Sequence, residues 1–239
     1  MIITLMGTGS IWSKKLSSCM LVDNKILVDC PNGLFKASMR KGIDLTNIDL
    51  CLITHYHGDH YFDLPFLLLA MGMTAIRQRP IYICGPKGLE GKITELFNLA
   101  YPDQWEKVKM NSKIQFVEYE NLQNKQIING YSISSYEVEH NGFQSYGYTI
   151  TKSGKTVGIT GDTVLCCGVR DILNKSDLAF VDMTFEKNSK SHMGFNNMLT
   201  LKEQYKNTII IPTHMGDEVR GLYLEKYGDL PEDWQVYNI

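Results

Sequence analysis

The sequence lacks long apolar runs and an excess of either charge, and both absences exclude classes of protein. The charge-free stretch Leu64–Ile76 is shorter than the roughly 18 to 20 residues of a membrane-spanning helix, so it indicates a buried core helix. Lysine and arginine number 24 against 26 acidic residues, with no long basic run, which argues against holding long nucleic acid by charge. The 44% hydrophobic content excludes an intrinsically disordered chain.

The chain also lacks a Cys-x-x-Cys pair and, at Met1–Met6, a positively charged leader with a cleavage site. Of its six cysteines, Cys19, Cys51 and Cys84 lie inside apolar runs, where a free thiol behaves as a small hydrophobic side chain. Cysteines used in this way are typical of a reducing compartment. Together with the missing leader they predict a cytoplasmic protein without a membrane partner.

Short β-branched runs alternate with helical patterns along most of the chain. The helical patterns predict helices over Leu34–Arg40, Asp63–Ala75, Leu89–Leu99 and Phe195–Lys206. The β-branched runs predict strands at Ile2–Met6, Cys19–Val22, Ile26–Asp29, Ile48–Thr54, Pro80–Cys84, Ile114–Tyr119, Tyr131–Val138, Tyr146–Thr151, Thr156–Thr160, Leu178–Asp182 and Thr208–Ile211. No linker or repeat interrupts this alternation, so we expect one layered α/β domain over residues 1–239.

Three histidines and an aspartate lie within six residues directly after the predicted strand Ile48–Thr54. His55 and His57 point the same way by the two-residue alternation of a strand, and the following turn brings Asp59 and His60 to a second point nearby. Imidazole nitrogens and carboxylate oxygens suit Zn²⁺ and similar metals. Without a metal, burying these groups together would leave desolvated polar atoms at a cost of kilocalories each. The cluster therefore predicts a metal site.

The other three histidines and one further aspartate lie at junctions between strands and loops. They are His140, Asp162, His192 and His214. Because α/β sheets place ligand sites at strand ends, we expect these side chains to form one site with the histidine cluster.

Several short motifs follow one another in a fixed order along nearly the whole chain. They are Gly7–Ser10, Leu27–Cys30, Thr54–His60, His140, Gly161–Thr163 and Pro212–His214. In this order they resemble the motifs of the metallo-β-lactamase superfamily. The opening, with Asp29 and Cys30, and the later pair Val181–Phe185 and His192–Gly194 look most like the ribonuclease Z branch. The resemblance implies an α/β fold, the four-layer αββα sandwich of the metallo-β-lactamases.

The resemblance also implies a site for two divalent metal ions, with Zn²⁺ expected and Mn²⁺ as the alternative. The ligands by that match are His55, His57 and His140 for one ion, Asp59, His60 and His214 for the other, and Asp162 as the bridge. Two interpretations of Asp29 stay open: a partner that orients a ligating histidine from beneath the site, or a simple turn residue.

The implied chemistry is hydrolysis of a phosphodiester. Two divalent ions that share a water lower the pKa of that water enough to supply hydroxide at neutral pH, and they neutralise the attacked phosphate. The match assigns His192 to protonating the leaving oxygen or stabilising transition-state charge, with Asp182 fixing its tautomer and Asp59 completing the catalytic set. The alternative is that His192 only caps the predicted helix Phe195–Lys206.

Comparison with other branches of the superfamily reduces the number of reactions that the sequence supports. Asp162 stands where true β-lactamases commonly use a cysteine, which disfavours antibiotic cleavage. His57 stands where diiron oxidoreductases usually carry a glutamate, which disfavours redox chemistry without excluding it. Ribonuclease Z proteins hold transfer RNA with a long arm between the downstream histidine and the bridging aspartate. Here Asp162 follows His140 by only 22 positions, which leaves no room for an arm.

Two further departures from the ribonuclease motifs are Pro31-Asn32 and Met193-Gly194. The sequence looks closer to armless members of the branch, which include the compact anti-Pycsar enzymes and the cyclic phosphodiesterases of phosphonate breakdown. We therefore expect a small phosphodiester, a 3′,5′-cyclic mononucleotide, as substrate and no stable nucleic-acid partner. Two alternatives stay open: a tRNA 3′-processing endoribonuclease, and a non-catalytic protein that binds nucleotides with the help of metal.

Members of this branch commonly form homodimers, and the resemblance suggests a homodimer here. Apolar and aromatic residues near the end of the chain either cover a partner's active site or pack onto their own sandwich, and we favour the second. These residues are Leu222, Tyr223, Leu224, Tyr227, Trp234 and Tyr237.

Overall fold

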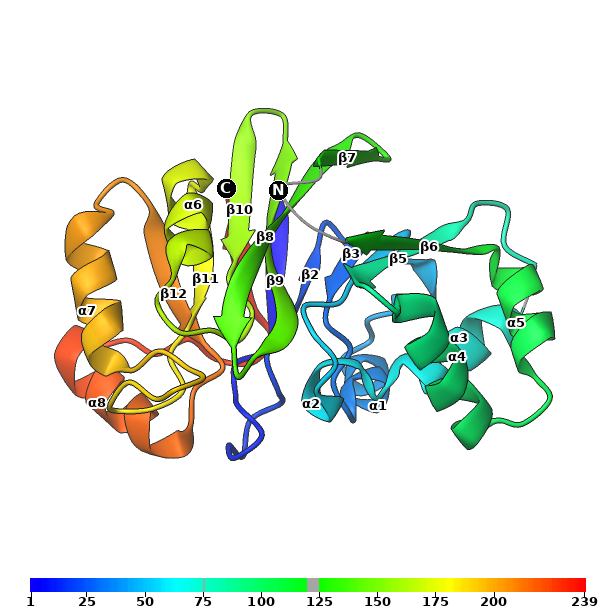
Figure 1. The fold of residues 1–239 in the computed structure, drawn as a ribbon, viewed down its shortest axis with the longest axis horizontal. Coiled ribbons are helices and arrows are strands. Elements are labelled where there is room, and N and C mark those ends of the chain that lie inside the picture. Colours follow the sequence, from blue (N-terminus) through cyan, green and yellow to red (C-terminus); the bar gives the residue numbers. More distant parts are fainter. Residues whose placement is uncertain (75, 120–124) are drawn as a thin grey trace.

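Two β-sheets face each other, and helices cover the outer side of each (Figure 1). The computed structural model describes residues 1–74, 76–119 and 125–239. The first sheet consists, in order across it, of β13 (Gln235–Asn238), β1 (Ile2–Gly7), β2 (Cys19–Val22), β3 (Ile26–Val28), β4 (Leu50–Leu52), β5 (Ile81–Pro86) and β6 (Ile114–Tyr119). The second consists, in order, of β12 (Ile209–Thr213), β11 (Leu178–Asp182), β10 (Lys155–Ile159), β9 (Phe143–Lys152), β8 (Tyr131–His140) and β7 (Lys125–Ile128).

The helices form the two outer layers. Those on the first sheet are α1 (Leu34–Arg40), α2 (Gly58–Tyr61), α3 (Leu64–Thr74), α4 (Leu89–Ala100) and α5 (Trp105–Ser112), with a 3-10 helix, η1, at Leu45–Asn47. Those on the second sheet are α6 (Cys167–Lys175), α7 (Phe195–Gln204) and α8 (Asp217–Tyr227). Figure 1 shows the first group on the right and the second on the left. The order is the αββα sandwich that the sequence predicts.

Burial on both faces of the sheets explains why many strands are continuously apolar. Every residue of β2 and of β11 is buried, as expected for strands covered on one side by helices and on the other by a second sheet. Between the sheets, Val28 and Leu52 of the first pack with Tyr148 and Phe180 of the second. This shared core holds the strand ends of both sheets in a fixed relation, and those ends carry the predicted site residues.

Two tight hairpins shape the second sheet near the site. Asn141 (φ 49°) and Gly142 (φ 73°) join β8 to β9, and Ser153 (φ 51°) and Gly154 (φ 77°) join β9 to β10. Two successive positive φ values are the geometry of the turn that suits a twisted two-residue hairpin. The first turn ends β8 at His140. Residues 143–159 between His140 and Asp162 are thus a hairpin, without a protruding arm.

The structure departs from the sequence prediction mainly in short elements. Helices α2, α5, α6 and α8 and strands β7 and β13 are additional, and β4 is shorter than the predicted strand Ile48–Thr54. Helix α3 ends at Thr74, and the predicted last residue, Ala75, lies outside the described residues. Helix α7 ends at Gln204, two residues before the predicted end. Within the described ranges, no helix is long and apolar enough to cross a membrane.

The C-terminal segment packs onto its own sandwich, as favoured from the sequence. Strand β13 pairs with β1 in antiparallel register, from Ile2 opposite Asn238 to Leu5 opposite Gln235. Tyr237 packs against the core between the sheets and Tyr223 is buried under the second sheet. Self-packing does not account for all six residues, because Leu224 is 47% exposed and Tyr227 is 38% exposed.

Candidate metal centre

Three histidines from two segments converge at one point. His55 and His57 lie in the loop after β4, and His140 is the last residue of β8. The Nδ1 atom of His57 lies 3.0 Å from Nε2 of His55 and 3.1 Å from Nε2 of His140. Ligand nitrogens of a tetrahedral zinc site, each about 2.0–2.1 Å from the metal, lie about 3.3 Å apart. The three nitrogens are therefore spaced as ligands of one small cation.

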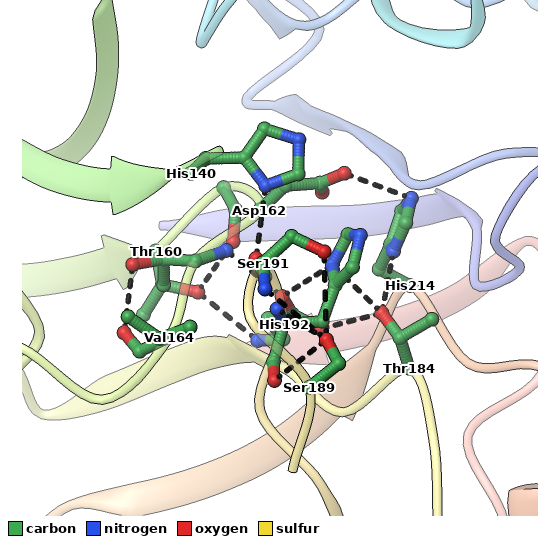
Figure 2. Close-up of polar contacts among 12 residues, drawn as sticks. His140, Thr160, Asp162, Val164, Thr184, Ser189, Ser191, His192 and His214 are labelled. Atoms are coloured by element: carbon green, nitrogen blue, oxygen red, sulfur yellow. Dashed lines mark hydrogen bonds and ion pairs between the residues drawn. The ribbon is translucent and has the colours of Figure 1, made fainter. Parts of the chain in front are cut away.

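A second group of ligand atoms surrounds Asp162, three residues after β10. Oδ2 of Asp162 lies 3.1 Å from Nε2 of His214 and 3.3 Å from Nε2 of His60. Oδ2 of Asp59 lies 3.7 Å from each of the same two nitrogens. The Asp162 oxygen is also 3.9 Å from Nε2 of His55, so this carboxylate lies between the two groups. Figure 2 shows Asp162 between His140 and His214.

Two buried nitrogens in this cluster have no hydrogen-bond partner among the described residues: Nε2 of His60 and Nε2 of His214. Each ring is oriented through its other nitrogen, His60 by Oδ2 of Asp29 at 2.8 Å and His214 by Oγ1 of Thr184 at 2.8 Å. An unpartnered buried polar atom costs about 1–3 kcal/mol. A cation between these nitrogens and the Asp162 carboxylate would remove that cost, so the residues fit divalent-metal binding.

The electrostatics of the cluster agree with this fit. Burial lowers the pKa of His55 well below its ordinary value, and burial also lowers the pKa values of His57 and His140, which keeps these rings neutral and able to bind a metal. Burial opposes ionisation of Asp162, but the neighbouring His214 and His60 hold its pKa well below the usual range. Burial disfavours the imidazolium of His60, but the charges of Asp162 and Asp29 outweigh burial and raise the pKa of His60 well above its ordinary value. The cluster thus presents neutral imidazoles at His55, His57 and His140 and an ionised carboxylate at Asp162 that favours a positive charge beside it.

The backbone of the cluster adopts conformations that side chains rarely favour. Asp29 (φ 60°) and His214 (φ 56°) are both left-handed, which costs roughly 1–2 kcal/mol each and is typical of functional sites. Gly161 (φ 62°) supplies the same geometry directly before Asp162 without a Cβ, which would lie 3.1 Å from Thr54. Asp29 is therefore a turn residue and also a hydrogen-bond partner of His60, so the two interpretations made from the sequence describe the same residue.

His192 lies over the cluster and is held by Asp182. Its Nδ1 lies 2.9 Å from Oδ2 of Asp182, at the end of β11, and its ring stacks on that of His214 with 5.1 Å between centroids. Burial disfavours the imidazolium, but the Asp182 hydrogen bond outweighs it and raises the pKa of His192. The N-cap of α7 is Gly194, with no side-chain cap. The alternative in which His192 caps this helix is therefore wrong.

Three residues of the site were not predicted from the sequence. Thr54 donates its backbone N–H to Oδ1 of Asp29 (2.8 Å), and Thr184 donates its hydroxyl to Oδ1 of Asp182 (2.7 Å). Ser191 accepts the Nδ1–H of His140 through its backbone carbonyl (2.9 Å), as Figure 2 shows. Both threonines belong to motifs recognised in the sequence, Thr54–His60 and Val181–Phe185, so their roles could have been predicted. The contact of Ser191 could not, because a backbone carbonyl is present at every residue and does not depend on the side chain.

Solved structures identify the class to which this fold belongs. The short form of human tRNase Z matches with a TM-score of 0.79 at 21% identity, over 100% of this chain and 99% of that one. The metallo-β-lactamase fold protein YhfI from Bacillus subtilis matches with a TM-score of 0.75 at 15% identity, over 99% and 98% of the two chains. The chain therefore has the metallo-β-lactamase fold.

Sequence comparison identifies the family within this class. The model of the Anti-Pycsar protein Apyc1 family matches residues 1–230, and the chain belongs to that family. Among curated relatives, ribonuclease Z of Lachnoclostridium phytofermentans is 39% identical over 127 residues, which are 53% of this chain and 39% of that protein. The chain spans less than half the length of the first curated relatives that it matches.

Proposed function

We propose that this protein is a metal-dependent phosphodiesterase that hydrolyses a 3′,5′-cyclic mononucleotide. The observation that carries the proposal is the position of Asp162. Its carboxylate lies between two groups of histidines, and the His192–Asp182 pair lies beside them. A carboxylate between two metal positions and a protonated imidazole next to them are the parts that phosphodiester hydrolysis needs.

Two divalent cations suit the donor set. The first would be held by His55, His57 and His140, the second by Asp59, His60 and His214, with Asp162 shared. Nitrogen donors with few carboxylates favour Zn²⁺, and Mn²⁺ is the alternative. When bound, such a pair acidifies a shared water and neutralises the charge of a phosphate group.

The chain's own residues then supply orientation and a proton. Asp182 accepts the Nδ1–H of His192, so Nε2 is the atom from which His192 gives a proton to the leaving oxygen of the substrate. Asp29 holds the ring of His60, and Thr184 holds the ring of His214, with the Nε2 atoms aimed into the cluster. The side chain of Asp59 completes the cluster beside those two rings.

A small substrate is favoured over transfer RNA by the hairpin between His140 and Asp162 and by the net charge of −2. The family match supports the same choice, because the sequence resembles armless enzymes that hydrolyse cyclic nucleotides. Transfer-RNA 3′ processing remains the second candidate, because the curated relatives bear the name ribonuclease Z. A metal-dependent nucleotide-binding protein without turnover is the third.

One experiment separates the three candidates. The metal-loaded protein is incubated with a panel of cyclic mononucleotides, cyclic dinucleotides and a precursor tRNA, and the products are separated by chromatography. We expect a nucleoside monophosphate from the cyclic mononucleotides and an intact tRNA. The Asp162→Asn variant should lose this turnover, whereas the matched control Asp171→Asn, on α6, should keep it. Cleaved tRNA would favour the second candidate, and bound nucleotide without product the third.

The remaining expectations belong to the same proposal. We infer a homodimer, which the resemblance suggests and which fits the half-exposed apolar residues Phe62, Phe66 and Met73 beside and on α3. Sedimentation of the purified protein tests it. We also infer that residues 1–239 act as one domain, because both sheets share one core, and that the protein works in a reducing cytoplasm, where its cysteines stay free.

A further inference from the structure

A cavity of about 620 Å³ lies directly beside the metal centre. One wall contains Thr184, whose hydroxyl contacts both His192 and His214. Trp12 and Phe185 contribute aromatic rings to the same cavity. The volume falls in the range of roughly 300–1,000 Å³ that is usual for small-molecule sites.

Trp12 is unusual among the residues of this cavity because its large apolar side chain is exposed. Its side chain is 77% exposed, although a tryptophan normally gains a large free energy from burial. It lies in the loop between β1 and β2, which projects from the lower edge of the molecule in Figure 1, the edge that also carries α2. Phe185, after β11, is 38% exposed and its ring contacts that of His192 at 5.7 Å between centroids.

Hydrogen bonds fix the loop of Trp12 in place. Oδ1 of Asp217, at the start of α8, accepts the hydroxyl of Ser13 at 2.6 Å and the backbone N–H of Lys14 at 3.2 Å. The backbone N–H of Ser10 donates to the carbonyl of Met215 at 3.1 Å. Both attachments are to the segment that follows His214. The loop that carries the exposed indole is therefore fixed relative to the metal centre.

We propose that this cavity is the nucleobase subsite, in which Trp12 stacks on the base while the phosphate lies at the metal centre. The inference rests on the proposed function, because it names the part of that site that holds the base. Stacking of a base on an aromatic side chain is worth enough to change affinity about fivefold to more than a hundredfold, and it tolerates any base because every base has a π-face. We therefore expect broad base specificity with the larger purines bound best.

The charges of the cavity decide which end of the nucleotide enters it. Three carboxylates, those of Glu186, Asp217 and Glu218, line it together with one cation, that of Lys187, so its charge is net negative. Carboxylates repel a phosphate but accept hydrogen bonds from the N–H groups of a base. The base therefore enters this cavity, and the phosphate lies at the histidine cluster.

A second cavity, of about 530 Å³, is lined by His140 itself and offers one exposed aromatic ring, that of Phe143. That ring packs edge-on against His57 at 4.9 Å between centroids, so it already supports a predicted metal ligand. The cavity of Trp12 has two aromatic rings and contact with His192 and His214 through Thr184. It is the better place for a base, and Phe143 serves as the discriminating control.

The test compares two probes on the metal-loaded protein by calorimetry: adenosine 5′-monophosphate, which carries a base, and ribose 5-phosphate, which does not. We expect the first to bind at least about tenfold more tightly. The Trp12→Ala variant should bring that ratio close to one, and Trp12→Phe should restore most of it. Variants Phe143→Ala and Leu99→Ala, the second a matched exposed residue on α4, should keep the ratio. Quenching of tryptophan fluorescence by the first probe should disappear in Trp12→Phe.

Each outcome decides the proposal. A ratio unchanged in Trp12→Ala overturns it, and so does a ratio lost in Phe143→Ala but kept in Trp12→Ala, which would place the base in the second cavity. Cyclic-nucleotide turnover without any base-dependent affinity would refute the subsite and leave the proposed function standing. Base-dependent affinity that requires Trp12, without turnover of any cyclic nucleotide, would refute the proposed reaction and keep the subsite.

Discussion

The side-chain oxygen of Thr184 accepts a hydrogen bond from the Nδ1–H of His214 over 2.8 Å. The same hydroxyl donates to Oδ1 of Asp182, whose other oxygen holds His192. One threonine therefore connects the predicted metal ligand to the predicted acid, and the orientation of both rings depends on it. Metal-ligating histidines commonly need such a partner on their second nitrogen.

Replacing Thr184 tests this connection. Thr184→Val keeps the shape of the side chain but leaves the buried Nδ1–H of His214 without an acceptor, so we expect zinc affinity and kcat/KM to fall about 10- to 100-fold. Thr184→Ser keeps the hydroxyl and should restore most of both. Competition with a fluorescent zinc chelator measures the affinity. Binding by Thr184→Val that equals the wild-type value would contradict the role given to this hydroxyl.

The histidine motif could be recognised from the sequence because its residues are local. His55 through His60 follow one buried strand, and a strand end followed by a turn fixes the directions of neighbouring side chains. The fold class followed from the same local alternation of strands and helices. The sequence does not show which loops meet in space. The approach of the Trp12 loop to Asp217 joins residues about 200 positions apart. The strand-end positions of His140 and His214 indicated that both belong to the site, but only the resemblance assigned each to a metal position.

The helices that the sequence did not predict have weak or short patterns. Helix α8 buries only Val219, Arg220 and Tyr223. Because one of these buried positions is an arginine, the sequence does not show a continuous apolar face with helical spacing. That arginine is held by Oγ1 of Thr8 at 2.9 Å, a contact between the two ends of the chain. In α6 the apolar positions Val169, Ile172 and Leu173 have helical spacing, but the helix is only nine residues long.

The role of His192 can be tested through the leaving group. A cyclic nucleotide releases an alkoxide, which needs a proton, whereas p-nitrophenolate leaves without one. We expect His192→Ala to lower kcat on a cyclic nucleotide about 10²- to 10⁴-fold and to lower kcat on bis-p-nitrophenyl phosphate by a much smaller factor. Asp182→Asn should also lower kcat more on the cyclic nucleotide than on bis-p-nitrophenyl phosphate, because it removes the carboxylate that fixes the tautomer of His192.

Metal content is the control for that experiment. His192 and Asp182 lie close enough to His214 to be ligands themselves. Equal losses on both substrates, together with less bound metal by elemental analysis, would mean that His192 binds metal and does not act as the acid.

Removal of metal should change the stability of the fold. Because the predicted ligands come from the ends of β4, β8, β10 and β12, a cation that binds them stabilises the native state by mass action. We expect chelation to lower the melting temperature, and added Zn²⁺ or Mn²⁺ to restore it. Chelation and added metal should shift the melting temperature of the Asp162→Asn variant far less than that of the control variant Asp171→Asn. If neither chelator nor added metal changed the melting temperature of the wild-type protein, that result would contradict cation binding by this cluster.

Asp23 gives a prediction of pH dependence away from the metal centre. It lies in the turn between β2 and β3, and its Oδ2 accepts hydrogen bonds from Tyr131 (2.8 Å) and Lys152 (3.0 Å) of the other sheet. Burial opposes the ionised form, but hydrogen bonds from the backbone of Ile2, from Lys152 and from Tyr131 outweigh it and lower the pKa of Asp23. The carboxylate thus joins the two sheets more strongly when it is ionised than when it is protonated.

The sign of the effect follows from that lowered pKa. A carboxyl group with a lower pKa in the folded state than in the unfolded chain stabilises the fold fully above the unfolded value of about 3.9, and the contribution disappears as the pH falls through the folded value. We therefore expect the difference in melting temperature between wild type and Asp23→Asn to be largest at about pH 6 and to shrink below about pH 4. Thermal denaturation across this range measures it, with Asp171→Asn as the control. A difference that stays constant or grows on acidification would show that Asp23 does not join the sheets through its charge.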